Sequence, residues 1–246
     1  MQTIEDFKTR FCKTCLARWW HRYAPPLLLR RQYYDKTIFM NLRDNIFYFS
    51  MSTPELEKYE ENVMSVLEFC EGPIWDVGAN VGLFSVRASL FGLRCVAFEL
   101  SPVTCRLLQK TKEFNHLDFD IIEQPFTLIN RSYLPPMTAS AENKVTFVDT
   151  GDYKTITYQE AHKLYGLPAL IKMDIEGGEA EFFNSVKFKK WLFDYSIAWL
   201  VEVHHEKLGF LPEWQDFPHA ILQSNHYLYC KDSSKLDRLT EYSKYG

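Results

Sequence analysis

Ionisable side chains gather at the ends of two apolar segments in the second half of the chain. Lys172, Asp174 and Glu176 alternate along one segment, and Glu202 and His204 alternate at the end of the next. Burying such groups without partners is costly, so their position indicates a site. A carboxylate or an imidazole can remove the proton of a reacting hydroxyl. The catalytic residues predicted from this pattern are Lys172, Asp174, Glu202 and His204.

The same side chains allow a second chemistry. Asp174, Glu176, Glu202 and His204 are hard or borderline ligands, and a Mg²⁺ ion among them could lower the pKa of an acceptor hydroxyl. Their spacing is not diagnostic of a metal site. We therefore predict metal-free chemistry and keep Mg²⁺ as the alternative.

A glycine-rich turn provides a second chemical signal. The segment DVGANVG (76–82) follows a predicted strand and opens a predicted helix. Glycine lets the backbone turn tightly and approach a ligand, and the helix N-terminus adds N–H donors. Glu99 ends the next predicted strand, where a carboxylate can accept hydrogen bonds from both ribose hydroxyls. Glu99 could instead only cap the helix that begins at Pro102, but the turn before it favours a ligand.

The residue two positions before the first glycine distinguishes between NAD and S-adenosylmethionine as the possible ligand. NAD sites have the pattern GxGxxG, whereas Gly78, Asn80 and Gly82 stand here. Asp76 would repel a pyrophosphate but suits the amino group of S-adenosylmethionine. The sequence thus predicts S-adenosylmethionine as the cofactor. The cofactor-binding residues predicted are Asp76, Gly78, Ala79, Asn80, Gly82, Glu99 and Asp174.

The elements that must position these residues alternate between strands and helices from residue 73 onward. The predicted strands are 74–77, 94–100, 119–122, 169–175, 196–203 and 227–230, and the predicted helices are 83–91, 102–115, 158–165, 178–186 and 217–224. Between them, 126–129 and 145–148 are predicted to pair as an inserted hairpin. Such alternation predicts parallel strands joined by right-handed crossovers. We expect an α/β, doubly wound, mostly parallel sheet with helices on both faces.

Residues 1–53 are predicted as an extension of the main domain, 54–246. The extension combines an amphipathic helix in 1–23 with a hairpin in 36–51 that turns at 43–45, and a helix over 55–69 follows. Residues 1–34 carry a net charge of +5, whereas the rest of the chain carries −9. This basic arm could contact a membrane surface, an anionic substrate or a partner. Folding against the acidic body is the favoured interpretation.

Four motifs resemble the FkbM-like family of S-adenosylmethionine-dependent methyltransferases. They are IWDVGANVGLFSVRAS (74–89), VAFELSP (96–102), LIKMDIEGGE (170–179) and LVEVHHE (200–206), and the resemblance spans roughly 36–206. It implies a class I methyltransferase (Rossmann-like) fold and O-methylation of a sugar, glycolipid or natural product. It places the methionine end at Asp76, Gly78, Asn80 and Gly82, and the ribose at Glu99. It places Lys172, Asp174, Glu176, Glu179, Glu202 and His204 on the acceptor side.

The resemblance leaves part of the site open. Residues 123–126 lack the small-residue pattern expected after the third strand, so the adenine contacts stay unassigned. We hypothesise that His204 or Asp174 is the base and that the other orients it. Lys172 could instead only form an ion pair with Asp174 or Glu202. Glu181, in the first turn of a predicted helix, is given no function.

Composition and net charge narrow the classes of function that are expected for this chain. The net charge of −4 and a pI near 6.0 give no general reason to expect nucleic-acid binding. Neither a signal-peptide pattern nor an apolar run of membrane-spanning length is visible, and most of the six cysteines lie in apolar stretches, so a reduced, cytoplasmic protein is expected. A small-molecule or glycan acceptor is predicted. An RNA or protein methyltransferase and a non-catalytic S-adenosylmethionine-binding module are the alternatives, and the oligomeric state is open.

Overall fold

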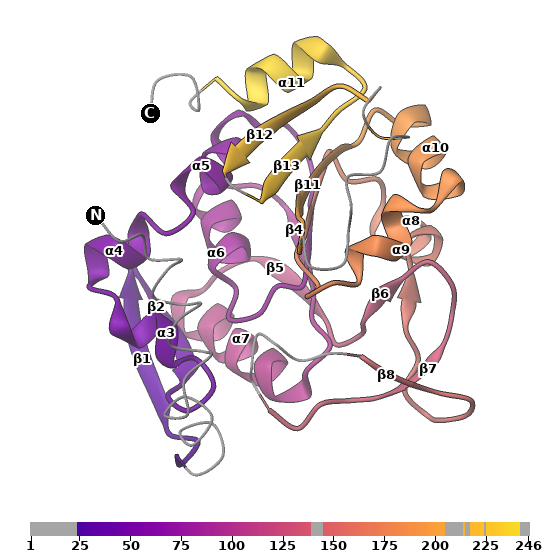
Figure 1. Ribbon diagram of the computed structural model, residues 1–246. Coiled ribbons are helices and arrows are strands. Elements are labelled where there is room, and N and C mark those ends of the chain that lie inside the picture. Colours follow the sequence, from indigo (N-terminus) through magenta and orange to yellow (C-terminus); the bar gives the residue numbers. More distant parts are fainter. Residues whose placement is uncertain (1–23, 139–144, 205–213, 215–216, 224, 242–246) are drawn as a thin grey trace.

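A seven-stranded sheet forms the centre of the protein. The computed structural model describes residues 24–138, 145–204, 214, 217–223 and 225–241. The sheet has the order β12-β13-β11-β10-β3-β4-β5 (Figure 1). Its strands are β3 (Ile74–Val77), β4 (Cys95–Phe98), β5 (Phe119–Ile122), β10 (Leu170–Met173), β11 (Ala198–Glu202), β12 (His219–Gln223) and β13 (His226–Tyr229).

The strand directions establish the fold class. β5, β4, β3, β10 and β11 run parallel, and β13 runs antiparallel to both of its neighbours. The chain winds outward from β3 through β4 and β5, and then returns to wind outward through β10 on the other side. This is the doubly wound, mostly parallel sheet of the class I methyltransferase fold, as predicted. Its switch point lies between β3 and β10, where such sheets bind ligands.

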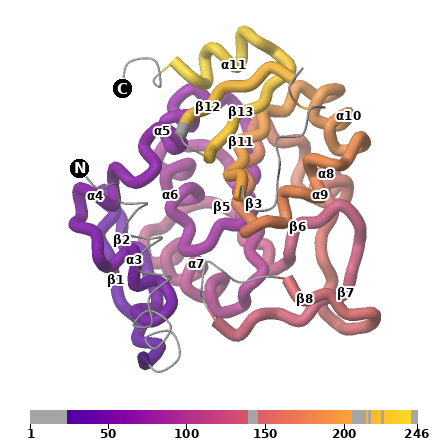
Figure 2. The backbone as a smooth tube through the Cα atoms, in the orientation of Figure 1, coloured from indigo at the N-terminus to yellow at the C-terminus, as the bar shows by residue number. Residues whose placement is uncertain are grey.

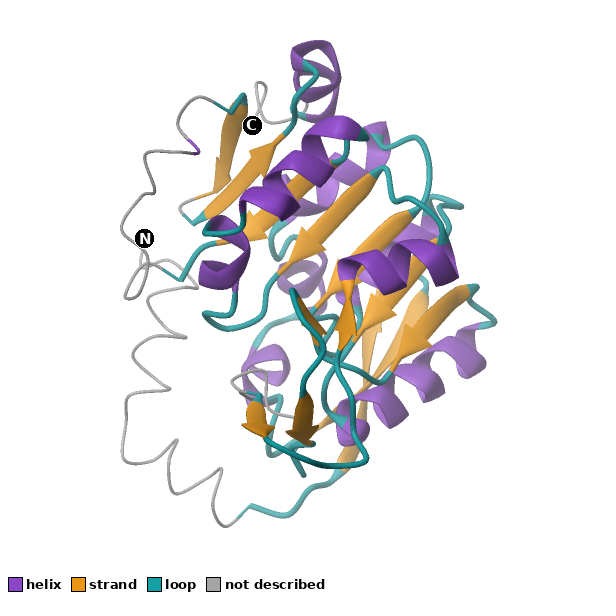
Figure 3. Ribbon diagram, turned by 90° about the vertical axis from the view of Figure 1, so that its right-hand side faces the viewer, coloured by secondary structure: helices purple, strands orange, loops and turns teal. Residues whose placement is uncertain are grey.

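Helices cover both faces of the twisted sheet (Figure 3). They are α6 (Leu83–Leu90), α7 (Pro102–Asn115), α8 (Tyr158–Tyr165), α9 (Glu179–Phe183), α10 (Val186–Asp194) and α11 (Ser233–Leu239). Ser101 caps α7 by accepting from the N–H of Thr104, and Thr157 forms a capping box with Glu160 at α8. These caps explain why the predicted bounds 102–115 and 158–165 match the helices.

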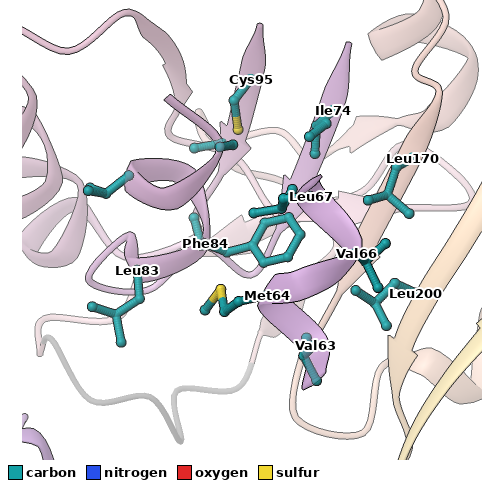
Figure 4. Close-up of a cluster of buried hydrophobic side chains, with 14 of the residues drawn as sticks. Val63, Met64, Val66, Leu67, Ile74, Leu83, Phe84, Cys95, Leu170 and Leu200 are labelled. Carbon is teal, nitrogen blue, oxygen red and sulfur yellow. The ribbon is translucent and has the colours of Figure 1, made fainter. Parts of the chain in front are cut away.

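Two hydrophobic cores follow from the two-residue period of the strands. Ile74, Leu170 and Leu200 face one core, whereas the adjacent Trp75, Ile171 and Trp199 face the other. Figure 4 shows Val66 and Phe84 in the first core, on the face that carries Ile74, Leu170 and Leu200.

The N-terminal hairpin differs from the prediction. It consists of β1 (Leu28–Tyr33) and β2 (Lys36–Asn41), and the predicted returning strand, 46–51, is instead the helix α3 (Ile46–Ser50). β2 lies beside α7 (Figure 2), and the N–H of Phe39 donates to Thr111 Oγ1 at 3.0 Å. β1 and α7 thus occupy the two sides of β2, and residues 46–51 do not pair with it.

The predicted helix over 55–69 is divided into three pieces. They are α4 (Thr53–Glu57), α5 (Glu61–Met64) and the 3₁₀ helix η1 (Ser65–Phe69). Ser52 is the N-cap of α4, as predicted, and forms a capping box with Glu55. The break falls at Glu60, whose φ is 55°. The predicted domain boundary between 53 and 54 lies inside α4, so the two parts share a helix.

Three further elements correct the prediction. The inserted hairpin pairs β7 (Ser132–Leu134) with β8 (Thr146–Val148), whereas β6 (Phe126–Thr127) pairs in parallel with β9 (Ile156–Thr157). The helix predicted over 178–186 ends at Phe183, and α10 follows. The helix predicted over 217–224 is wrong, because the edge strand β12 stands there and pairs with β13. Helix propensity is overridden where a sheet edge offers hydrogen bonds.

Some sequence features fall outside the described residues. The predicted helix in 1–23 and the pair Cys12 and Cys15 lie there. Among the described cysteines, Cys70, Cys95, Cys105 and Cys230 are buried free thiols, as expected. No helix in the described part of the chain is both long and apolar enough to span a bilayer.

Candidate functional site

The turn after β3 depends on its glycines. Gly78 and Gly82 have φ values of 79° and 87°. A Cβ on Gly78 would overlap the carbonyl oxygen of Asp174, and a Cβ on Gly82 would overlap the Leu108 side chain. The N–H of Asp174 also donates to the carbonyl oxygen of Val77 at 3.0 Å. The turn is therefore pressed against the end of β10, and only glycine fits at position 78.

Glu99 connects this turn to the end of β4. One of its carboxylate oxygens accepts from the N–H of Asn80 at 2.9 Å, and the other accepts from the N–H of Ser101 at 2.8 Å. Burial raises the pKa of Glu99, while these backbone hydrogen bonds oppose the rise. Ser101 is the cap of α7, so the capping alternative does not account for Glu99. Each carboxylate oxygen can still accept a second hydrogen bond.

Asp76, which is predicted to bind the cofactor, is fully buried. Its side chain is 0% exposed, and its Oδ2 accepts from Ser85 Oγ at 2.6 Å. Its other oxygen lies 3.8 Å from Lys172 Nζ. Burial raises the pKa of Asp76, and the charge of Lys172 opposes this. Asp76 lies beneath the turn, where it supports Lys172.

Lys172 joins the two strand ends at the switch point. Its Nζ lies 3.8 Å from Asp76 and 3.6 Å from Asp174, and it donates to the carbonyl oxygen of Gly78 at 3.4 Å. Burial alone would lower the pKa of Lys172, but the charges of Asp174 and Asp76 outweigh it and raise the pKa. Lys172 therefore stays charged and cannot act as a base at neutral pH. The Lys172–Asp174 ion pair considered from the sequence is present, and Asp76 joins it.

His204 lies among carboxylates. Its Nε2 is 3.5 Å from Glu176 Oε2 and 4.0 Å from Asp174 Oδ1, and its Nδ1 is 3.4 Å from Glu179 Oε1. The Glu179 carboxylate beside Nδ1 raises the pKa of His204 to about 9, against the effect of burial and with help from Asp174. The imidazole is therefore protonated at neutral pH. This favours Asp174 over His204 as the group that accepts a proton.

Glu202 is held by the strand beside it. Its Oε1 accepts from Asn225 Nδ2 at 2.6 Å, and its Oε2 is 3.5 Å from His226 Nε2. Glu202 and His226 are direct partners in the register of β11 and β13. Asn225 and His226 were not singled out in the sequence, because their role depends on the antiparallel pairing of the last strand.

Within the part of the chain that the structure describes, two groups of side chains have the spacing to hold a metal ion. Asp174, Glu202 and His204 place one ligand atom each within 4.8 Å of one another, and Glu60, Glu202 and His226 do the same. The first group contains three of the four ligands proposed from the sequence. The fourth, Glu176, is in neither group. Glu60 was missed because it was assigned to the interior of a helix.

An apolar pocket and an acidic pocket meet at this site. They have volumes of about 210 Å³ and about 50 Å³, and both are lined by Gly78 and Glu176. The apolar pocket is further lined by Val77, Phe98, Leu100, Gln124, Pro125, Phe126, Thr127, Val145, Phe147, Ile175, Gly177, Gly178, Glu181 and Phe182. The acidic pocket is further lined by Tyr48, Tyr59, Glu60, Met64, Ala79, Asn80, Val81, Leu83, Phe84, Lys172, Asp174 and Glu202. Gln124, Pro125 and Phe126 thus join the site, although the sequence left them unassigned.

The acidic pocket contains strained backbone. Glu60, Asn80 and Glu176 have φ values of 55°, 49° and 55°, in the left-handed region that non-glycine residues seldom adopt. Such conformations persist only where the surroundings impose them, and they concentrate at functional sites. Asn80 is further fixed by donating to the Tyr48 hydroxyl at 3.4 Å. The N-terminal part of the chain therefore contacts the glycine-rich turn directly.

A much larger groove, of about 1090 Å³, lies beside the apolar pocket. It runs between the β7–β8 hairpin and α8, and the two cavities share Gln124 and Phe147. None of the predicted site residues lines it. The volume of a cavity alone therefore does not identify the predicted site in this molecule.

Comparison with known proteins found similar structures but no family to which the chain can be assigned. No family model and no curated protein matches the chain. One similar structure is the tRNA (uracil-54, C5)-methyltransferase of Pyrococcus abyssi in complex with S-adenosyl-L-homocysteine, with 13% identity and a TM-score of 0.44 over 82% of this chain and 43% of that one. Another is the 16S rRNA N2 G1207 methyltransferase of T. thermophilus in complex with AdoMet and guanosine, with 13% identity and a TM-score of 0.46 over 84% and 52%.

A putative transferase from Pyrococcus horikoshii has 10% identity and a TM-score of 0.46 over 85% of this chain and 72% of that one. The chain spans about half the length of the two RNA-modifying enzymes, 43% and 52%. Because these identities and TM-scores are low, the assignment of the fold class rests on the strand order of the central sheet. The FkbM-like resemblance rests on its motifs.

Proposed function

We propose that this chain is an S-adenosylmethionine-dependent methyltransferase that methylates a hydroxyl of an uncharged acceptor, such as a sugar, a glycolipid or a natural product. One observation carries the proposal: an apolar pocket and an acidic pocket meet at Gly78 and Glu176, at the carboxyl ends of β3 and β10. An apolar cavity suits an adenine ring, and an adjoining acidic cavity suits a sulfonium and an ammonium group.

The residues present fit the donor. Phe98, Pro125 and Phe126 offer apolar surface to the base, and Glu99 lies beside the turn, where it can accept from ribose hydroxyls. Asp174 can accept from the amino group of the methionine end. When bound, S-adenosylmethionine supplies the methyl group and leaves as S-adenosylhomocysteine.

The acidic pocket would prepare the acceptor. Asp174 would take the proton of the acceptor hydroxyl as that oxygen receives the methyl group that the bound donor would supply. Lys172 orients Asp174 from 3.6 Å, and protonated His204 lies 4.0 Å from its other oxygen. A positioned base of this kind contributes about 10²–10⁴-fold to the rate. Glu202, held by Asn225 and His226, would bind acceptor hydroxyls rather than move a proton.

The charge of the acidic pocket favours methylation of an acceptor hydroxyl over methylation of RNA. Two similar structures are described as RNA methyltransferases, but they share only 13% identity with this chain. The acidic pocket is lined by four carboxylates, from Glu60, Asp174, Glu176 and Glu202, and by a single ammonium, from Lys172. Such a surface repels phosphates, whereas RNA-binding sites are positively charged. A non-catalytic binding module would not need this cluster at the strand ends.

A direct experiment separates these readings. Calorimetry first measures binding of S-adenosylmethionine and S-adenosylhomocysteine to the full chain. Donor with a labelled methyl group is then incubated with a panel of neutral glycans and polyols, and separately with bulk tRNA and rRNA. We expect label in a neutral acceptor, and its loss in Asp174→Asn but not in Asp194→Asn, a surface carboxylate that pairs with Lys190. No donor binding, or label only in RNA, would overturn the proposal.

A further inference from the structure

Glu181, which had no function assigned from the sequence, brings a carboxylate to the apolar pocket. It lies in the first turn of α9, where an acid is expected simply because it complements the helix dipole. The structure adds a second feature, since Glu181 also lines the apolar pocket. Among the described residues, the only other carboxylate that lines this pocket is that of Glu176, at the junction with the acidic pocket. Helix stabilisation therefore does not account for the place of Glu181 in the pocket.

Arg131 holds this carboxylate from the side of the large groove. Its Nη1 donates to Glu181 Oε1 at 3.1 Å, and its guanidinium lies 4.6 Å from the centre of the Phe147 ring. Arg131 lines the groove but not the apolar pocket, whereas Phe147 lines both. The cation thus lies outside the pocket while the carboxylate forms part of its wall. Each carboxylate oxygen has more than one lone pair, so Glu181 can still accept a hydrogen bond from a ligand.

The neighbouring cavities determine how a nucleoside would lie in the apolar pocket. The pocket shares Gly78 and Glu176 with the acidic pocket, where the methionine end of the donor would lie, and it shares Gln124 and Phe147 with the groove. Adenine is attached to ribose through its five-membered ring. Its six-membered ring, which carries the exocyclic amine, would therefore face the groove side. Glu181 stands on that side, because its ion-pair partner lines the groove.

A carboxylate discriminates between bases because it can only accept hydrogen bonds. The exocyclic amine of adenine donates, whereas a base with a carbonyl oxygen at that position would place two acceptors side by side. Gln124 lines the same pocket, but its amide has both a donor and an acceptor and can serve either base. Covering a carboxylate with an apolar surface that offers no donor is costly. Glu181 therefore favours a base that carries the amine.

We propose that Glu181 selects adenine in the methyl donor by accepting a hydrogen bond from the exocyclic amine, and that Arg131 holds the carboxylate for this contact. The inference rests on the proposed function and names the residue that recognises the base. Phe126 and Phe182, whose rings stack with their centres 5.7 Å apart, line the same pocket. They offer apolar surface to any base, so the discrimination falls to Glu181.

The test is calorimetry on the full chain with two ligands: S-adenosylhomocysteine, and its analogue in which purine replaces adenine, so that only the exocyclic amine is missing. The wild type should bind S-adenosylhomocysteine about 10-fold or more tightly than the analogue, as expected for a hydrogen bond to a charged group. Glu181→Ala should reduce this preference to about 3-fold or less. The matched control, Asp194→Ala, removes another surface carboxylate, paired with Lys190, and should keep the wild-type preference. An unchanged preference in Glu181→Ala overturns the proposal.

A second variant keeps the test decisive. The Glu181 side chain is 43% exposed, so thermal unfolding should show that Glu181→Ala is folded. If it does not fold, Glu181→Gln replaces it. Glutamine keeps an acceptor oxygen but loses the charge, so the preference should fall about 2-fold or more, and no fall refutes the role of Glu181. A wild type that binds neither ligand counts against the proposed function itself, whereas one that binds both equally tightly counts only against this role.

Discussion

Replacing Gly78 with alanine tests how tightly the glycine-rich turn is pressed against β10. The new Cβ would overlap the Asp174 carbonyl oxygen and lie 2.8 Å from its carbon, below the 3.0 Å that real Cβ contacts respect. A left-handed φ costs a non-glycine residue about 1–2 kcal/mol. Relieving an overlap by moving packed backbone costs a further ~1–3 kcal/mol. Together we expect Gly78→Ala to lower the free energy of unfolding by about 2–5 kcal/mol.

The assay is urea unfolding followed by circular dichroism, with Gly151→Ala as the control. A Cβ at Gly151 would meet ordinary contacts at 3.5 Å and 3.7 Å, so its effect should stay within about 0.5 kcal/mol. If Gly78→Ala is as stable as that control, the turn has room to spare, and the reasoning about this close approach is refuted.

The remaining predictions concern the base, the imidazolium, the hairpin and the metal. Asp174→Asn should reduce turnover on the true acceptor by about 10²-fold or more while thermal unfolding stays close to wild type; unaltered turnover would exclude Asp174 as the base. The raised pKa of His204, about 9 against an ordinary 6.5, means that its stabilising effect is complete below pH 6.5 and is lost as the pH rises through 9. The wild-type urea midpoint should therefore fall over that range more than the midpoint of His204→Gln, and parallel curves would contradict this. Thr111→Val leaves the buried N–H of Phe39 without an acceptor and should cost about 1–3 kcal/mol in urea unfolding; a neutral result would remove this anchor of the hairpin. Turnover should persist in EDTA, and a loss that Mg²⁺ restores would favour a metal at Asp174.

The central sheet could be predicted because its signals are local. The strands 74–77 and 119–122 are short apolar runs bounded by turns, and Ser101 followed by Pro102 marks a helix start. Elements at the margins depend on distant partners. The segment 217–224 has no local sequence feature that indicates an edge strand, because the strand there is formed by pairing with β13.

The candidate site was predictable to the extent that strand ends determine it. Lys172, Asp174 and His204 come together because β10 and β11 are adjacent and parallel. The burial of Asp76 follows from the alternation that places it on the same face as Ile74, toward the core, and this signal was available in the sequence. The position of the Glu60 carboxylate was not predictable. It depends on the break between α4 and α5, where Glu60 adopts a left-handed backbone conformation.

The wall of the acidic pocket formed by Tyr48, Tyr59, Glu60 and Met64 comes entirely from residues that precede the first strand of the central sheet. Under the proposed function, the acceptor would therefore meet two separate stretches of the chain, this wall and the strand ends that carry Asp174 and Glu202. Substitutions within residues 46–64 would then alter the choice of acceptor while the glycine-rich turn and the strand ends stay as they are.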